Sequence, residues 1–150
     1  MEAPRIIRRV DQPVHPLHGE GRIRRIVYPT TVGSGNIFLG IAEVAPGEAP
    51  HVFHRHTREV VGDVVMTYAD DFEEFYYVVA GEGTMQWKTA EGTLREVPVA
   101  AGDAVYFPPD AMEHRILNTG EAMLSVLYGG TPPARIAPIE RRQGETPWPR

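Results

Sequence analysis

The chain has 150 residues and a formal net charge of −5, which fits a single domain and argues against a nucleic-acid-binding protein. It contains no cysteine, so disulfides, thiolate metal sites and a cysteine nucleophile are excluded. The 15 glycines and 14 prolines exceed the usual share, which favours many short strands joined by turns over a few long helices.

The amino-terminal sequence MEAPRIIRRV has no apolar run of signal-peptide length, and no segment approaches the ~20 apolar residues that cross a bilayer. We therefore expect a cytoplasmic protein that binds neither membranes nor nucleic acid. Several arginines lie near this end of the chain, dispersed among apolar residues. They indicate the solvated faces of two arm strands rather than a track for phosphates: Arg5, Arg8, Arg9, Arg22, Arg24 and Arg25.

Strand-like runs, each ending at turn residues, follow an expected extended arm of residues 1–35. The runs are NIFLGIAEV, EFYYVVA, TMQWKT, LREVPV, AVYF and AMLSVLYG. They predict an all-β sandwich or barrel over residues 36–130 rather than alternating βα units. The Pro-rich tail, residues 131–150, is expected to be irregular and to lie on the surface or on a neighbouring subunit.

The segment HVFHRH, residues 51–56, holds three of the six histidines. The neighbouring runs favour a strand here, in which His54 and His56 share one face. His51 then points away, as a structural or surface histidine. In a helix, His51 and His54 would lie together instead. The pair alone is a weak signal, because one His-x-His by chance is unremarkable in a chain of this composition.

Two other stretches strengthen the signal. EFYYVVAG places Glu74 seven residues before Gly81, at the entrance of an apolar run. GDAVYFPPDAMEHRILN leads to His114, which in a strand shares its face with Ile116 and Asn118.

In these residues the sequence resembles the cupin family. The segments PGEAPHVFHRH and EFYYVVAG are similar to the first cupin motif, and GDAVYFP and HRILN are similar to the second. The resemblance covers residues 36–129 and implies a double-stranded β-helix, also called a jelly-roll barrel. It further implies a homodimer and one divalent transition metal ion per subunit. The implied metal ligands are His54, His56, Glu74 and His114.

The chain departs from the family pattern by an insertion, residues 57–73, ahead of Glu74. This insertion is expected to be either a lid or wall over the barrel mouth, or a hairpin that extends the sheet or packs at a dimer interface. Glu59 and Glu73 rival Glu74 as the fourth ligand, but strand parity disfavours Glu59 and the spacing to Gly81 disfavours Glu73. Some cupins use three histidines alone, in which case Glu74 only forms hydrogen bonds near the metal.

Three imidazoles and a carboxylate suit Fe(II), the favoured ion, or manganese, nickel, cobalt or zinc. The implied function is a metalloenzyme acting on a small oxygenated organic molecule, first of all a non-haem iron dioxygenase. A metal-dependent isomerase or lyase of a sugar or hydroxy acid, and a non-enzymatic small-molecule-binding cupin, are the alternatives. YYVVAGEGTM is similar to the sugar-isomerase branch of cupins, although no basic cluster for a phosphate is evident. Tyr76 and Tyr106 are candidate catalytic acids if they face the cavity, and core aromatics otherwise.

Overall fold

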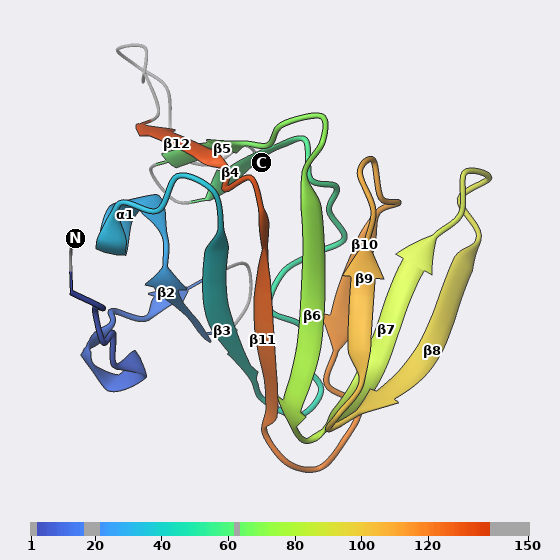
Figure 1. Ribbon diagram of the computed structural model, residues 1–150. Helices are drawn as coiled ribbons and strands as arrows, with labels where there is room; N and C mark the ends of the chain where they lie inside the picture. Colours follow the sequence, from blue (N-terminus) through green and yellow to red (C-terminus); the bar gives the residue numbers. More distant parts are fainter. Residues whose placement is uncertain (1–2, 17–21, 62–63, 139–150) are drawn as a thin grey trace, which may run out of the picture.

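The computed structural model describes residues 3–16, 22–61 and 64–138, and its regular structure is almost entirely β-strand (Figure 1). In chain order the elements are η1 (Arg9–Asp11), β1 (His15–Pro16), β2 (Arg22–Val27), α1 (Pro29–Val32), β3 (Phe38–Val44), β4 (Arg58–Val61), β5 (Val64–Thr67), β6 (Glu73–Ala80), β7 (Glu82–Lys88), β8 (Leu94–Ala100), β9 (Ala104–Phe107), β10 (His114–Leu117), β11 (Leu124–Thr131) and β12 (Arg135–Pro138). The all-β fold predicted from the sequence is confirmed. Each of the six strand-like runs is a strand: β3, β6, β7, β8, β9 and β11.

The largest sheet has six strands in the order β1-β2-β3-β11-β6-β9 (Figure 1). All its neighbours pair antiparallel. The register places one residue from each of four neighbouring strands in a single row: Arg25, Gly40, Tyr128 and Tyr76. Residues paired in this way point to the same face of a sheet, so this row brings chemically different side chains to one inner surface.

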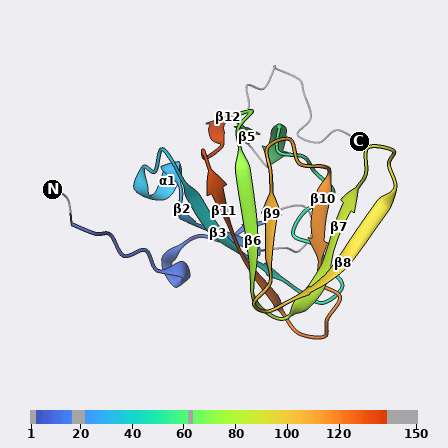
Figure 2. The same ribbon diagram turned by 45° about the vertical axis from the view of Figure 1, so that its right-hand side comes forward.

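A second sheet, in the order β10-β7-β8, faces the first, and Figure 2 shows the two curving around a common interior. The hydrophobic core lies between them. It contains Val78 and Val126 from the large sheet and Met85 and Ile116 from the small one. Along β6 the buried positions alternate with more exposed ones, as a strand with one face on a core requires.

Gly81, the glycine of the first cupin motif, lies in the turn from β6 into β7, and the backbone of this turn requires a glycine. Gly81 has a φ of +82°, a region that L side chains rarely adopt. A Cβ atom there would also lie 2.7 Å from the carbonyl oxygen of Met123. Because this turn fixes where β6 ends, it also fixes how far along β6 Glu74 lies.

The insertion folds as a hairpin, with β4 antiparallel to β5. Strand β12 pairs with the other edge of β5, so the insertion and the start of the tail form a small three-stranded sheet at one end of the barrel (Figure 1). The expectation of an irregular tail is therefore wrong for Arg135–Pro138. This strand pairs with an edge of β5 that would otherwise have no hydrogen-bonded neighbour strand. The remaining tail, 139–150, lies outside the described residues.

Part of the expected arm also belongs to the large sheet. Strand β2 pairs with β3, and Ile23 is 92% buried in the core, with 8% of its surface exposed. Arg22 and Arg24 have the opposite parity, and Arg24 lies 3.8 Å from Glu43 on the outer face. Arg25 shares the parity of Ile23, so the expectation of a solvated face is wrong for this arginine.

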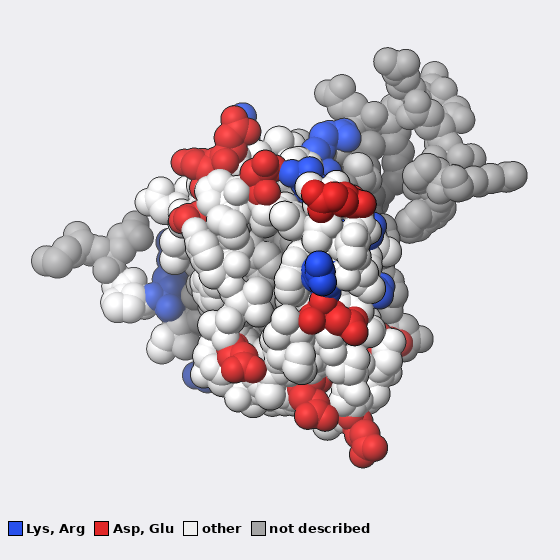
Figure 3. Space-filling model, turned by 90° about the vertical axis from the view of Figure 1, so that its right-hand side faces the viewer, with Lys and Arg blue, Asp and Glu red and all other residues white. Residues whose placement is uncertain are grey.

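The charged side chains on the face shown in Figure 3 do not gather by sign. Acidic groups are spread over this face with basic groups between them, which agrees with the modest net charge of −5. In the part of the chain that the structure describes, no helix has the length and apolar character needed to cross a membrane.

Candidate metal centre

Residues 51–56 do not form the regular strand predicted from the sequence. Their only ladder contact is an isolated bridge between His54 and His114. The His54 amide lies 3.3 Å from the His114 carbonyl oxygen, and the His114 amide lies 3.0 Å from the His54 carbonyl oxygen. Pro50 directly precedes the segment and has no N–H to continue a ladder. This single bridge nevertheless joins the two histidine-bearing segments through their backbones.

Three of the predicted ligands come together. One ring nitrogen from each of His54, His56 and His114 lies within 4.8 Å of the others. The Nε2 atoms of His54 and His56 are 3.1 Å apart. His114 begins β10, in which Ile116 is also buried, and Asn118 directly after the strand is buried as well, as strand parity predicts.

Glu74 completes the cluster. It lies on the inner face of β6 with 7% of its surface exposed, and its Oε2 is 2.9 Å from His56 Nε2. Glu73 faces the other way and accepts a hydrogen bond from the Tyr106 hydroxyl on the outer surface. For Glu59, the third candidate of the sequence, the side chain lies outside the described part of the structure.

The three histidines could together hold a metal ion, and Glu74 lies beside His56. An octahedral ion with bonds of about 2.1 Å separates neighbouring ligand atoms by about 3.0 Å. The 3.1 Å between His54 Nε2 and His56 Nε2 and the 2.9 Å between His56 Nε2 and Glu74 Oε2 agree with this spacing. His114 Nδ1 lies 2.8 Å from the Met112 carbonyl oxygen, so the ring donates there and keeps a lone pair on Nε2. That Nε2 is buried and makes no hydrogen bond within the described residues.

The protonation states of His54 and His114 also favour the binding of a cation. Burial, together with the neighbouring His56, lowers the pKa of His114 to about 3. Burial and the surrounding histidines hold the pKa of His54 well below its usual value. Both rings are therefore neutral near pH 7, which is the form that binds a metal.

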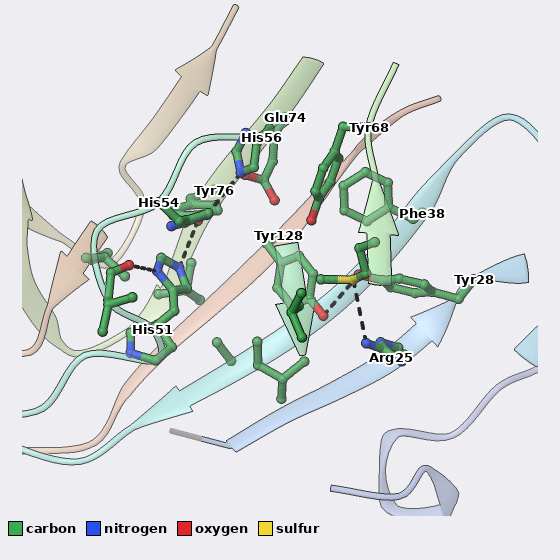
Figure 4. A pocket seen from close by; sticks show the side chains of 18 residues that line it. Arg25, Tyr28, Phe38, His51, His54, His56, Tyr68, Glu74, Tyr76 and Tyr128 are labelled. Atoms are coloured by element: carbon green, nitrogen blue, oxygen red, sulfur yellow. Dashed lines mark hydrogen bonds and ion pairs between the residues drawn. The ribbon is translucent and has the colours of Figure 1, made fainter. Parts of the chain in front are cut away.

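The cluster opens into a cavity of about 190 Å³ inside the barrel (Figure 4). Its walls are mainly apolar, with Phe38, Ile116 and Val126 among them. The insertion contributes Val60, Met66 and Tyr68, so it forms a wall of the cavity, as one of the two expectations held. It is also a hairpin, but one that forms a separate sheet with β12 and does not extend the barrel sheet.

His51 does not point away from the site, contrary to the strand-based prediction. It lines the same cavity, and its ring centroid is 3.9 Å from that of His54. Because residues 51–56 lack regular pairing, alternation of faces does not apply across them. His51 Nδ1 lies 3.0 Å from the Val52 carbonyl oxygen, and His51 Nε2 lies 3.3 Å from the Tyr76 hydroxyl.

The two tyrosines proposed as acids have different positions. Tyr76 is buried, with 4% of its surface exposed, and lines the cavity. Tyr106 is 61% exposed and does not line it. The register explains this, because β9 pairs Tyr106 with the outward Phe75 and pairs Phe107 with the inward Glu74.

Besides His51, sequence reasoning missed several polar or aromatic cavity residues, among them Arg25, Tyr28, Tyr68 and Tyr128. Strand parity in RIRRIV could have placed Arg25 on the same face as Ile23, had that segment been assigned to the barrel sheet. The tyrosines carry no local signal that separates a cavity wall from a core.

Comparison with curated proteins gives relatives of several kinds. Protein SchB of Streptomyces halstedii is 30% identical over 126 residues, which are 83% of this chain and 75% of SchB. The dimethylsulfoniopropionate lyase DddW of Ruegeria pomeroyi is 33% identical over 114 residues, 76% of this chain and 60% of DddW. A glucose-6-phosphate isomerase of Thermococcus onnurineus is 43% identical over 51 residues, 34% of this chain and only 26% of the isomerase.

Solved structures share the fold. A cupin 2 conserved barrel domain protein of Salinispora arenicola superposes with a TM-score of 0.53 at 20% identity, over 87% of this chain and 88% of that one. Bacillus subtilis oxalate decarboxylase, described with Mn(II) centres, superposes with a TM-score of 0.59 at 22% identity, over 88% of this chain and 31% of that one. Residues 60–128 match the Cupin_2 family, a cupin domain. The jelly-roll barrel, this match and the relationship to SchB agree: the chain belongs to the cupin superfamily.

Proposed function

We propose that the protein is a metal-dependent cupin enzyme of the lyase or isomerase type, acting on a small organic molecule. His54, His56, His114 and Glu74 would hold one divalent transition metal ion. The observation that carries this proposal is the convergence of three imidazoles and a buried carboxylate on one end of a small, mainly apolar cavity. The Mn(II) centres of the structurally similar oxalate decarboxylase support a divalent ion and leave its identity open.

The bound ion would supply Lewis acidity, which polarises an oxygen of the substrate. The protein's own side chains do the rest. Glu74 balances part of the positive charge, and the apolar walls exclude water from the reacting end of the cavity. Tyr76 and His51 are positioned to move a proton, because the His51 ring that donates to the Val52 carbonyl keeps its Nε2 lone pair toward the Tyr76 hydroxyl.

The relatives favour this reaction class over the dioxygenase expected from the sequence. Those reported above include a lyase, an isomerase and, by fold, a decarboxylase, and none of them is named as a dioxygenase. Many lyase and isomerase reactions on oxygenated substrates proceed through proton transfer next to a carbonyl, and an acid–base pair together with a Lewis acid accelerates such a step.

The test has two independent readouts. Elemental analysis of protein purified without chelators should give about one transition metal ion per chain. Candidate hydroxy, keto and thioether acids are then incubated with the protein in D2O and followed by NMR, both in air and under nitrogen. We expect product or deuterium incorporation at equal rates in the two atmospheres. Oxygen uptake in proportion to turnover would instead identify a dioxygenase, and metal-free protein would contradict the proposed centre.

A further inference from the structure

The end of the cavity away from the histidines carries a cation that the proposed metal centre does not use. Arg25 lies on the inner face of β2 and lines the cavity (Figure 4). Of the described residues that line the cavity, it alone is a lysine or arginine. Its neighbour Arg24 has the opposite parity and lies beside Glu43 outside the barrel. The strand therefore separates one arginine from the rest and presents it to the interior.

The guanidinium of Arg25 lacks an anionic partner within the described structure. Its hydrogen-bond contact is with the Met66 thioether sulfur at 3.8 Å, and a thioether is only a weak acceptor. Its Cζ atom lies 5.4 Å from the ring centroid of Tyr28, in a cation–π arrangement. A half-buried guanidinium has five N–H donors, and these two contacts satisfy few of them.

Two tyrosine hydroxyls lie beside this cation. The Tyr28 hydroxyl donates to the Tyr128 hydroxyl across 3.3 Å. Tyr128 reaches β2 because the residue between them in the sheet row is Gly40, and a Cβ at that position would overlap the Tyr128 ring. Burial keeps the pKa of Tyr128 well above its usual value, so its hydroxyl stays protonated.

We propose that Arg25, with the Tyr28 and Tyr128 hydroxyls, binds the carboxylate of a small monoanionic substrate. The reactive end of that substrate would face the histidines, so this inference rests on the proposed function for its orientation. One guanidinium supplies one charge in a planar fork that matches a carboxylate. A phosphate dianion would call for further cations, which the described cavity wall does not offer.

The size of the cavity limits the substrate further. Its volume of about 190 Å³ corresponds to about six waters at their share of the liquid volume. Such a space suits a short-chain acid. The apolar residues of the cavity wall, including Phe38 and Val126, favour a hydrocarbon or thioether linker between the carboxylate and the reacting centre.

The experiment measures binding rather than turnover. Butanoate, butanamide of the same shape, and inorganic phosphate are titrated calorimetrically into the full-length protein, both metal-loaded and after treatment with EDTA. The variants are Arg25→Gln, Arg25→Lys and the control Arg22→Gln, which removes an exposed arginine from the same strand. We expect butanoate to bind the EDTA-treated protein at least about tenfold more tightly than butanamide or phosphate.

Arg25→Gln should remove that preference, Arg25→Lys should retain part of it, and Arg22→Gln should leave it unchanged. Equal binding of butanoate and butanamide, a preference for phosphate, no binding at millimolar concentrations, or equal effects of Arg25→Gln and Arg22→Gln would each overturn the proposal. If the protein contains no metal as purified and takes none up when metal is added, yet binds butanoate in an Arg25-dependent way, the proposed function is refuted and this site stands.

Discussion

At one end of the cavity, three imidazoles and a carboxylate from a loop and two strands lie close together. At the other end, a single guanidinium lies near two tyrosine hydroxyls (Figure 4). The histidine end is assembled by a contact between distant segments, since the 51–56 loop joins β10 through one bridge. The Arg25 end is assembled mainly by sheet register, since Arg25, Gly40 and Tyr128 lie in one row over β2, β3 and β11. Tyr28 follows directly after the end of β2.

The two ends of the cavity depend on different parts of the fold. Ligand geometry at the histidine end requires one loop to keep its position against a strand. Anion binding at the Arg25 end requires a glycine in the middle strand, so that a ring from the third strand can reach the first. Tyr128 links the two ends, because it interacts electrostatically with both Arg25 and Glu74. Changes at one end should therefore affect the other mainly through this contact.

The largest expected effect is the loss of the metal. The double change His54→Ala, His56→Ala removes two of the four proposed ligands, so metal content should fall from about one ion per chain to almost none, as measured by elemental analysis. His51→Ala is the control and should retain the ion, because the His51 ring is engaged with Val52 and Tyr76. Full metal content in the double variant would disprove the assignment.

The next effect concerns turnover at an intact metal centre. Tyr76→Phe removes the hydroxyl beside His51 and should lower kcat by about a hundredfold or more, the range for a lost acid–base group. Metal content should not change. Tyr106→Phe, on the outer face of the same sheet, should leave kcat unchanged because that hydroxyl contacts only Glu73 among the described residues. Similar losses in both variants would mean that the cavity position of Tyr76 does not matter.

A smaller effect is expected at the fourth ligand. Glu74→Gln keeps the shape but removes the negative charge, so the affinity for the metal should fall by about tenfold to a hundredfold. Glu73→Gln changes the adjacent residue on the outer face and should not alter it. Competition with a chelator of known affinity measures both. If the two variants bind metal equally well, the centre is held by the three histidines alone.

The smallest effect tests the Arg25 end. In Gly40→Ala the new Cβ would overlap the Tyr128 ring, so the free energy of unfolding should fall by about 1–3 kcal/mol, as for other overpacked sites. Gly35→Ala meets nothing within 4 Å and serves as the control. Urea unfolding measures both variants. Metal content should be normal in Gly40→Ala, and its loss there would show that the two ends are not independent.

Much of the barrel and of the histidine centre could be predicted from the sequence. The spacing of Glu74 to Gly81 in EFYYVVAG singled out Glu74, which lies on the buried face of β6. Whether Tyr76 faces the cavity was left open, and the structure places it there. Strand alternation placed His114 with Ile116. The homodimer and the cytoplasmic location stay predictions, and sedimentation of the purified chain would check the first.

Local alternation determines which residues of a strand share a face, and the sequence contains that information wherever a segment pairs regularly. Only the tertiary structure decided the rest. His51 lies in the cavity wall because its segment has a single bridge and no regular pairing, so its side chains do not alternate between two faces. Tyr106 was excluded by its register with Phe75, and Arg25 was turned inward by the pairing of β2 with β3. Register and pairing are non-local, since they depend on residues far along the chain, so no pattern within a single segment reveals them.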